Sequence, residues 1–216
     1  MGCQSCIDIS DSRSIETMIK MLGGRKMKNI KFLSKKREGK IEIVLGVFLL
    51  LFFIPVLASQ MQVSQYRATK TYVEDALAAS NLASAVIDIE VYGISNDVVI
   101  NDSDNAFGIY KQALKINLNL DDSWECPNKS AISGKVEIFE YIIYNVIDQD
   151  IEIYRYDALG NKSYSYMSDS LGSVIAPEGS TIEATSIYSR IGFPVESVFG
   201  IVVDAKKEKL VDILKN

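Results

Sequence analysis

Residues 41–57 read IEIVLGVFLLLFFIPVL, an apolar run in which Glu42 is the one charged residue. Extended to Ala58, the run approaches the ~20 residues that a helix needs to cross the hydrocarbon core of a bilayer. We therefore predict a single transmembrane helix over residues 41–58, with the lipid bilayer as the first partner of this protein.

Basic residues lie mostly on one side of this run. The nearest ones before it are Lys26, Lys28, Lys31, Lys35, Lys36, Arg37 and Lys40, whereas the nearest ones after it are Arg67 and Lys70. Because basic residues favour the cytoplasmic side of a span, residues 1–40 are predicted to be a basic cytoplasmic leader. Residues 59–216 are then an extracytoplasmic domain at the cell membrane. Met27 opens the compact basic lead-in and is an alternative translation start.

The net charge of −5 on the 216-residue chain is unevenly distributed. Residues 1–58 hold ten basic and five acidic residues, whereas residues 59–216 hold 13 basic and 23 acidic residues. The outer domain is long enough for one packed core. It is also acidic enough to repel phosphate backbones, which argues against nucleic acid as a partner.

Residue types exclude the most common catalytic systems. The chain has no histidine, and therefore no histidine base, Ser-His-Asp triad or histidine-ligated metal. It also has no Ser-x-x-Lys motif and no glycine-rich phosphate loop. Cys3 and Cys6 form one Cys-x-x-Cys pair and Cys126 is alone in the outer domain, too few for a zinc site or an internal disulfide there. We predict no enzymatic activity, cofactor or metal, with an Asp/Glu-pair glycosidase as the enzymatic alternative.

The helical pattern continues beyond the span, because neither Gly nor Pro recurs before Gly93. Apolar residues recur mostly every three, four or seven positions, which is the spacing of one helix face. They are Val63, Tyr66, Val73, Leu77, Ala83 or Ser84, and Ile87. We predict one nearly continuous helix from about Ile41 to about Glu90, whose outer stripe is a core face against the rest of the domain.

A second helix is predicted over residues 106–117, with Ser103 or Asp104 as its N-cap. The loop before it also contains Asp97 and Asp102, whose carboxylates are ligands that calcium accepts. Their spacing does not match an EF-hand loop, so capping and solvation are the predicted roles of these acidic residues.

From Lys135 onward the apolar period changes to two, and β-branched and aromatic residues dominate. The segments that fit strands are 136–147, 150–160, 161–168, 172–177, 180–195 and 198–205. Short turns such as Asp157–Asn161 favour an antiparallel sheet of five or six strands. Pro194 predicts a sheet edge or strand end, and residues 206–216 predict a last strand or a short helix. The predicted fold is therefore α+β, with a long transmembrane helix continuing into a domain built on an antiparallel sheet.

Tyrosines alternate along these strand segments. They are Tyr141, Tyr144, Tyr154, Tyr156, Tyr164 and Tyr166. Such rows pack across neighbouring strands of a half-buried sheet. Stacking on a carbohydrate or a partner protein is the alternative.

Two stretches resemble a known family. YVEDALAASNLASAVIDIEVYG at 72–93 and IYSRIGFPVESVFGI at 187–201 are similar to TadE-like membrane proteins of Tad (Flp-type) pilus assembly systems. The basic leader, the single membrane helix and the antiparallel sheet also resemble the organisation of pilins and pseudopilins over residues 27–216. The resemblance implies a pilin-like fold and a structural role at the bacterial cell surface.

Pilin precursors carry a leader that ends in Gly, then an apolar residue, with Glu at the fifth mature position. The matching residues for leader cleavage and assembly here are Gly39, Lys40 and Glu42. Lys40 replaces the apolar residue, and Glu42 is third rather than fifth. The resemblance implies cleavage after Gly39 and pairing of Glu42 with the freed amine of a neighbouring subunit. The alternative places Glu42 in the hydrated cytoplasmic interface.

The predicted function is a membrane-anchored structural or assembly component, similar to a minor pilin or pseudopilin, of a Tad-type pilus or related secretion system. Its protein partners are expected to be other subunits of that assembly, including further copies of this chain. The alternative is a secreted or surface-anchored binding module unrelated to pili. Val56–Ala58 supports that alternative, because it resembles a signal peptidase site after a basic and an apolar region.

Overall fold

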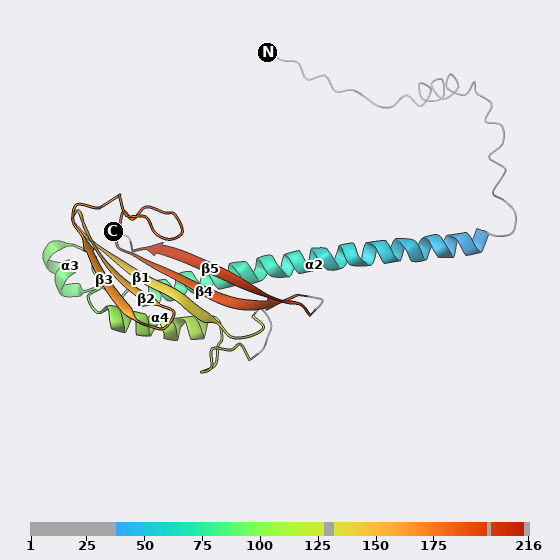
Figure 1. Cartoon of the computed structure of the whole chain (residues 1–216), viewed down its shortest axis with the longest axis horizontal. Helices are drawn as coiled ribbons and strands as arrows, with labels where there is room; N and C mark the ends of the chain where they lie inside the picture. The colour runs from blue at the N-terminus through green and yellow to red at the C-terminus, as the bar shows by residue number, and fades with distance from the viewer. Residues whose placement is uncertain (1–37, 128–131, 198–199, 214–216) are drawn as a thin grey trace, which may run out of the picture. The chain divides into compact units, whose positions relative to one another are not determined.

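The computed structural model in Figure 1 describes residues 38–127, 132–197 and 200–213 of the chain. The predicted leader lies outside these residues as far as position 37, and so does the alternative start at Met27. Within the described residues, a long apolar helix is followed by two shorter helices and a five-stranded antiparallel sheet. This arrangement confirms the α+β fold class.

Helix α2 (Glu38–Ser84) contains the whole predicted span and continues past Pro55. In the part of the chain that the structure describes, it is the one helix long and apolar enough to cross a membrane. The large apolar side chains of residues 41–57 are exposed, as lipid-facing side chains would be. The chain divides into two compact units, and the boundary between them falls between Pro55 and Val56.

The predicted continuation of this helix to Glu90 is wrong, because α2 stops at Ser84. The Ser84 hydroxyl donates to the Asn81 carbonyl oxygen at 2.8 Å in the last turn. Four residues later, the Asp88 carboxylate accepts hydrogen bonds from the first amides of a new helix, α3 (Ile89–Ser95). Ser and Asp side chains hydrogen-bond backbone groups that have no partner at a helix end. The boundary between α2 and α3 therefore forms without Gly or Pro.

Helix α4 (Ser103–Asn117) begins three residues earlier than predicted. Its N-cap is Asp102, whose carboxylate accepts from the Asn105 amide at 2.9 Å, and not Ser103 or Asp104. Ser103 is buried and its Oγ lies 3.1 Å from the Tyr156 hydroxyl. Asp102, Ser103 and Asp104 are all of residue types that make good N-caps. The burial of Ser103 against Tyr156 decides among them.

The sheet contains five strands in the order β3-β2-β1-β4-β5, and every neighbouring pair is antiparallel. The strands are β1 (Glu137–Ile147), β2 (Asp150–Asp157), β3 (Lys162–Met167), β4 (Ser186–Glu196) and β5 (Val202–Asp212). The β2–β3 turn is the predicted one: the Asp157 carboxylate accepts from the Leu159 and Asn161 amides, both at 2.9 Å. Residues 206–212 of the charged tail belong to β5, which confirms the strand alternative for this part of the tail.

The prediction of a strand over residues 172–177 is wrong. This segment belongs to the β3–β4 connection and makes one isolated bridge, between Ile175 and Thr181. Pro194 lies in β4 beyond Gly192, the last residue of that strand paired with β1, so its missing amide breaks no ladder bond on that side. The predicted strand end at Pro194 is therefore confirmed for the β1–β4 ladder.

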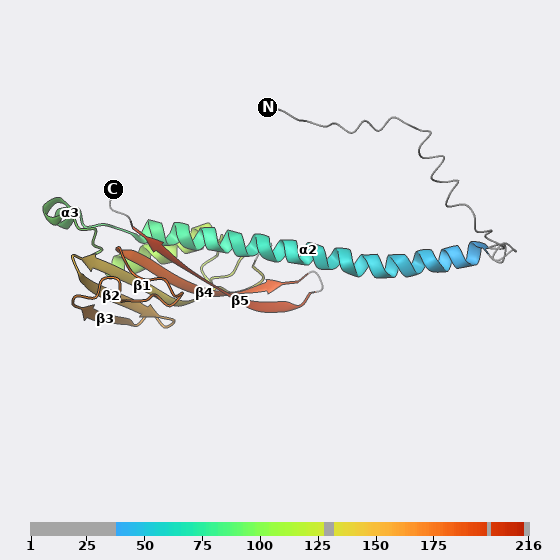
Figure 2. The same cartoon turned by 90° about the horizontal axis from the view of Figure 1, so that it is seen from above.

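The two faces of the sheet have separate cores. On one face, α2 and α4 pack through residues such as Leu77 and Tyr110 against Tyr141 and Ile187, and Figure 2 shows α2 running along this face. The other face is covered by the β3–β4 connection, which contributes Ala176 and Ile182 to a second, smaller core. Burial on both faces explains why β1 is nearly continuously apolar.

Candidate functional site

Gly39, Lys40 and Glu42, the predicted cleavage and assembly residues, all lie in the first turns of α2. The side chains of Lys40 and Glu42 are exposed. Among the described residues, no ion pair joins either of them to another side chain. Cleavage after Gly39 and subunit pairing through Glu42 remain predictions from the resemblance.

The apolar stripe of α2 is buried along only part of its length. Val73 and Leu77 are fully buried, as predicted, whereas Val63 and Tyr66 are 46% and 51% exposed. The prediction that the stripe is a core face from Val63 onward is therefore wrong for its first two residues. Near the other end, Ser84 rather than Ala83 is the buried member. The helix extends past the sheet core, and that leaves the beginning of the stripe without a covering element.

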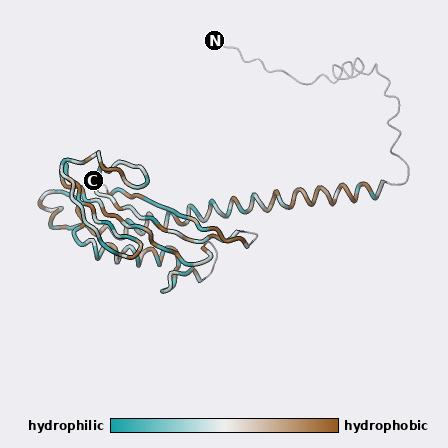
Figure 3. Tube along the Cα trace, viewed as in Figure 1, coloured by the Kyte–Doolittle hydropathy of each residue, from teal (hydrophilic) through white to brown (hydrophobic). Residues whose placement is uncertain are grey.

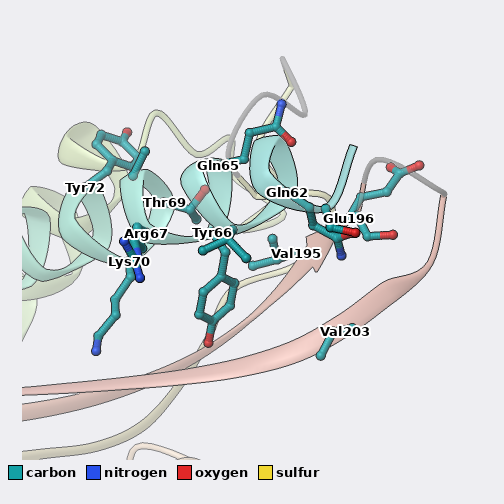
Figure 4. A pocket seen from close by; sticks show the side chains of 14 residues that line it. Gln62, Gln65, Tyr66, Arg67, Thr69, Lys70, Tyr72, Val195, Glu196 and Val203 are labelled. Atoms are coloured by element: carbon teal, nitrogen blue, oxygen red, sulfur yellow. The ribbon is translucent and has the colours of Figure 1, made fainter. Parts of the chain in front are cut away.

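A groove lies where the stripe is uncovered, and we call it the open groove. Its walls are α2 between Ser59 and Tyr72 on one side and Val195, Glu196, Ser197 and Val203 of the β4–β5 hairpin on the other. Its volume is about 850 Å³. Figure 4 shows Tyr66 projecting from the helix towards the hairpin, with Val195 and Val203 on the opposite wall. Every lining residue belongs to the second compact unit.

The hairpin end beside the open groove is itself apolar. Ile201, Val202 and Val203 are 62%, 55% and 54% exposed. Figure 3 shows hydrophobic colouring at this end of the β4–β5 hairpin. The Ser197 amide donates to the Ile201 carbonyl oxygen at 2.7 Å, and the Ile201 amide donates to Ser197 Oγ at 3.1 Å, so the two strands are hydrogen-bonded beside these side chains.

Cations border the open groove on the side away from Ser59. Arg67 and Lys70 line it from the helix, and neither forms an ion pair with another residue that the structure describes. Lys206 is exposed on β5, and its Nζ lies 5.0 Å from the centre of the Phe139 ring. Glu196 is the acidic residue in the lining. This margin is basic in a domain whose sequence is acidic.

Polar contacts tie the buried part of α2 to the sheet. The Glu74 carboxylate lies 2.7 Å from Lys207 Nζ and 3.2 Å from Lys209 Nζ, and these hydrogen bonds hold the pKa of Glu74 below its ordinary value. Asn81 is fully buried and donates to the carbonyl oxygens of Ile187 and Lys209, at 3.3 and 3.0 Å. The search of the sequence for an apolar stripe did not find Glu74 and Asn81, because single polar residues on a helix form no periodic pattern.

A further polar contact lies in the core beneath α2. The Tyr141 hydroxyl donates to Ser84 Oγ at 2.9 Å, and burial raises the pKa of Tyr141. The rings of Tyr141 and Tyr110 are 4.6 Å apart, which places both in one aromatic cluster. This cluster fixes the end of α2 opposite to the open groove.

Two of the acidic residues considered for calcium, Asp102 and Asp104, have structural partners. Asp102 caps α4, which confirms the capping role. Asp104 accepts from the Tyr156 hydroxyl at 2.7 Å and from Lys162 at 2.9 Å, and both bonds lower the pKa of Asp104. Over residues 38–127, 132–197 and 200–213, no group of three or more His, Cys, Asp or Glu is placed to hold a metal ion. Cys126 is a buried free thiol.

The tyrosine row divides between core and surface. Tyr141 and Tyr156 lie in the helix-side core and Tyr144 in the opposite core. Tyr154 and Tyr164 lie opposite each other on the paired strands β2 and β3, and their rings are 5.1 Å apart. The predicted cross-strand packing is confirmed for this pair.

No protein-family model matches the chain, and neither a curated protein nor a solved structure gives a significant match to it. The fold and its surfaces define the class by themselves: an α+β domain whose N-terminal helix is long and apolar enough to cross a membrane. Exposed apolar side chains follow one another along the first part of α2 and at the open groove with the adjoining hairpin end, whereas single ones such as Ile94 and Leu159 occur elsewhere.

Proposed function

We propose that this protein is a single-pass, membrane-anchored structural or assembly subunit, similar to a minor pilin or pseudopilin, of a Tad-type pilus or related secretion system. The observation that supports it best is α2 itself. One helix contains the apolar residues 41–57 and, further along, the buried stripe residues that join it to the sheet. A helix used in this way serves both as an anchor and as part of the domain core.

The basic residues before the span support a cytoplasmic N-terminus and an extracytoplasmic sheet domain. The absence of histidine and of nucleophile motifs from the sequence supports a role without catalysis. Subunit contacts are then expected through helix packing in the bilayer and through surfaces of the outer domain. Gly39, Lys40 and Glu42 are the residues proposed for leader cleavage and assembly.

Cleavage by signal peptidase after Ala58 would instead give a secreted binding module. Such a cut would fall inside α2, after Ala58, and would separate the buried stripe from the apolar run. The continuity of the helix therefore favours the anchored form. The two proposals differ in the mature N-terminus and in where the protein is found.

The test is to determine the N-terminus of the native protein by mass spectrometry, in membranes and in the medium. A membrane protein that starts at Lys40 is the expected result and supports processing as in pilins. A Gly39→Leu variant should then remain uncut, whereas the matched Gly46→Leu variant should be processed normally. A membrane protein with an intact leader would keep the anchor and overturn the cleavage. A protein that starts at Ser59 in the medium would overturn both.

Subunit assembly is tested by cross-linking in intact membranes, followed by size analysis. Glu42→Gln removes the carboxylate that the resemblance pairs with a neighbouring amine, and we expect it to abolish cross-linked multimers. Glu90→Gln, an exposed change in the outer domain, is the control and should leave them intact. Equal multimer yields from both variants would contradict the assembly role of Glu42.

A further inference from the structure

We propose that the open groove and the adjoining end of the β4–β5 hairpin form a second membrane contact, which seats the outer domain on the bilayer interface. This proposal rests on the proposed membrane anchor and goes beyond it, since an anchor alone leaves the domain free of the lipid surface. The occupant of the groove is lipid at the level of the headgroups and upper acyl chains.

The position of the groove along the chain is the first argument. Its lining begins at Ser59, directly after Ala58, the end of the predicted span. At a helical rise of ~1.5 Å per residue, Val63 is ~7 Å and Tyr66 is ~12 Å beyond Ala58 along the helix axis. The polar interface of a bilayer is roughly 5–8 Å thick on each side. The start of the groove therefore falls in the interfacial layer.

The order of residue types along the helix is the second argument. The apolar span is followed by the exposed Val63, then by Tyr66, then by Arg67 and Lys70. By the same helical rise, Tyr66, Arg67 and Lys70 lie ~12–18 Å beyond Ala58, just outside the interfacial layer, where an anionic membrane surface still attracts the two basic side chains. A protein partner would not require this order.

The hairpin end is the third argument, because it supplies a second wall with the same character. Ile201 and Val203 are more than half exposed, and Ile201 is hydrogen-bonded to Ser197 on the side of the neighbouring strand. Exposed aliphatic side chains gain free energy when they enter the interface. Val203 lines the groove opposite Val63 and Tyr66, and Ile201 lies two residues before it at the same hairpin end.

The test uses the full chain in vesicles of phosphatidylcholine and phosphatidylglycerol, with a polarity-sensitive dye on single introduced cysteines. Cys3 and Cys6 are replaced by serine, and the background protein with buried Cys126 alone measures any unwanted labelling. The labelled variants are Ile201→Cys at the hairpin end, Leu159→Cys at the exposed β2–β3 turn, and Leu50→Cys in the span. Lipids carrying a nitroxide near the headgroup quench a dye that lies in the interface, and lipids carrying it deep in the acyl chain are used for the dye at Leu50.

We expect the dye at Ile201 to be quenched at least about twofold more than the dye at Leu159, in line with shallow insertion. Quenching at Leu50 with none at Ile201 would overturn the second contact and leave the anchor intact. No quenching at either position would overturn the anchor as well. A blue-shifted dye at Ile201 that lipid does not quench, and that responds to protein density, would overturn the lipid proposal in favour of a second copy.

Substitutions in the groove test whether it makes the contact. Val63→Ser together with Val203→Ser should abolish at least about half of the quenching at Ile201, because the apolar walls are lost. The matched control is Tyr164→Ser with Tyr166→Ser on edge strand β3, which removes similarly exposed side chains and should change nothing. Both side chains in the groove are about half exposed, so folding is retained and circular dichroism checks it. Unchanged quenching in the groove variant would overturn the proposal.

Discussion

Two parts of the same helix face in α2 have the same apolar spacing and opposite surroundings. Val73 and Leu77 are fully buried against the sheet, whereas Val63 and Tyr66 are about half exposed beside the open groove. The difference shows that an apolar period identifies the face of a helix that is covered but not the material that covers it. Protein covers one part of this face, and we propose that lipid covers the other.

The buried part also has polar connections to the sheet. Glu74 and Asn81 both bond to β5, and Asn81 reaches β4 as well. Polar groups that are buried need such partners, so their presence marks the section of α2 that is permanently docked. Substitutions along the helix can therefore separate the docked section from the open one.

The largest effect is expected from Leu77→Ala. Leu77 is fully buried in the helix-side core, so the variant should lose about 2–5 kcal/mol of unfolding free energy through lost contacts and a cavity. Urea unfolding of the full chain in detergent micelles, followed by circular dichroism, measures the change. Val63→Ala is the matched control on the open part and should stay within about 0.5 kcal/mol of wild type. Equal losses would remove the distinction between the two parts.

A smaller loss is expected from Asn81→Ala. The substitution removes both side-chain hydrogen bonds to the Ile187 and Lys209 carbonyl oxygens, which should cost about 1–2 kcal/mol. The same urea titration measures it. Asn105→Ala, at an exposed position in α4, should change the unfolding free energy by no more than about 0.5 kcal/mol. A neutral Asn81→Ala would show that the docked section depends on apolar contacts alone.

The contribution of Glu74 should depend on pH. Its pKa is lowered in the folded protein by Lys207 and Lys209, so its stabilisation is fully present above the ordinary carboxyl pKa of 4.5 and is lost as pH falls through the lowered value. Glu74→Gln should cost up to about 1 kcal/mol at pH 7, because the pair is partly exposed. Thermal unfolding from pH 7 to pH 3 should show the two proteins converging in acid. A constant difference across this range would contradict the ion-pair origin.

Tyr66→Ala is expected to lose the least unfolding free energy relative to the size of the side chain that it removes. A buried aromatic residue loses about 3–5 kcal/mol on truncation, but Tyr66 is half exposed and should lose about 1 kcal/mol or less in micelles. Tyr110→Ala, whose side chain is fully buried in the same domain, is the comparison and should show the full loss. Similar losses for both would mean that protein already covers the open groove.

Local signals in the sequence predicted much of the fold. The period-two segments became β1, β2 and β3 within three residues, β4 begins six residues after its predicted start, and the Asp157–Asn161 turn formed where its residue types favour one. The errors fall where several local choices were equivalent. Ser103, Asp104 and Asp102 are all suitable N-caps, and the burial of Ser103 decided the outcome.

The membrane-spanning length of the apolar run, its basic flank, the antiparallel sheet and the apolar face of α2 could all be predicted from the sequence. These follow from composition, charge and period, which are properties of neighbouring residues. The tertiary structure was needed to show which part of the α2 stripe is buried and that β5 is tied to Glu74 and Asn81. These depend on residues more than 100 positions apart in the chain, whose meeting no local pattern encodes. The open groove follows from the same cause, because it exists only where the helix extends past the sheet core.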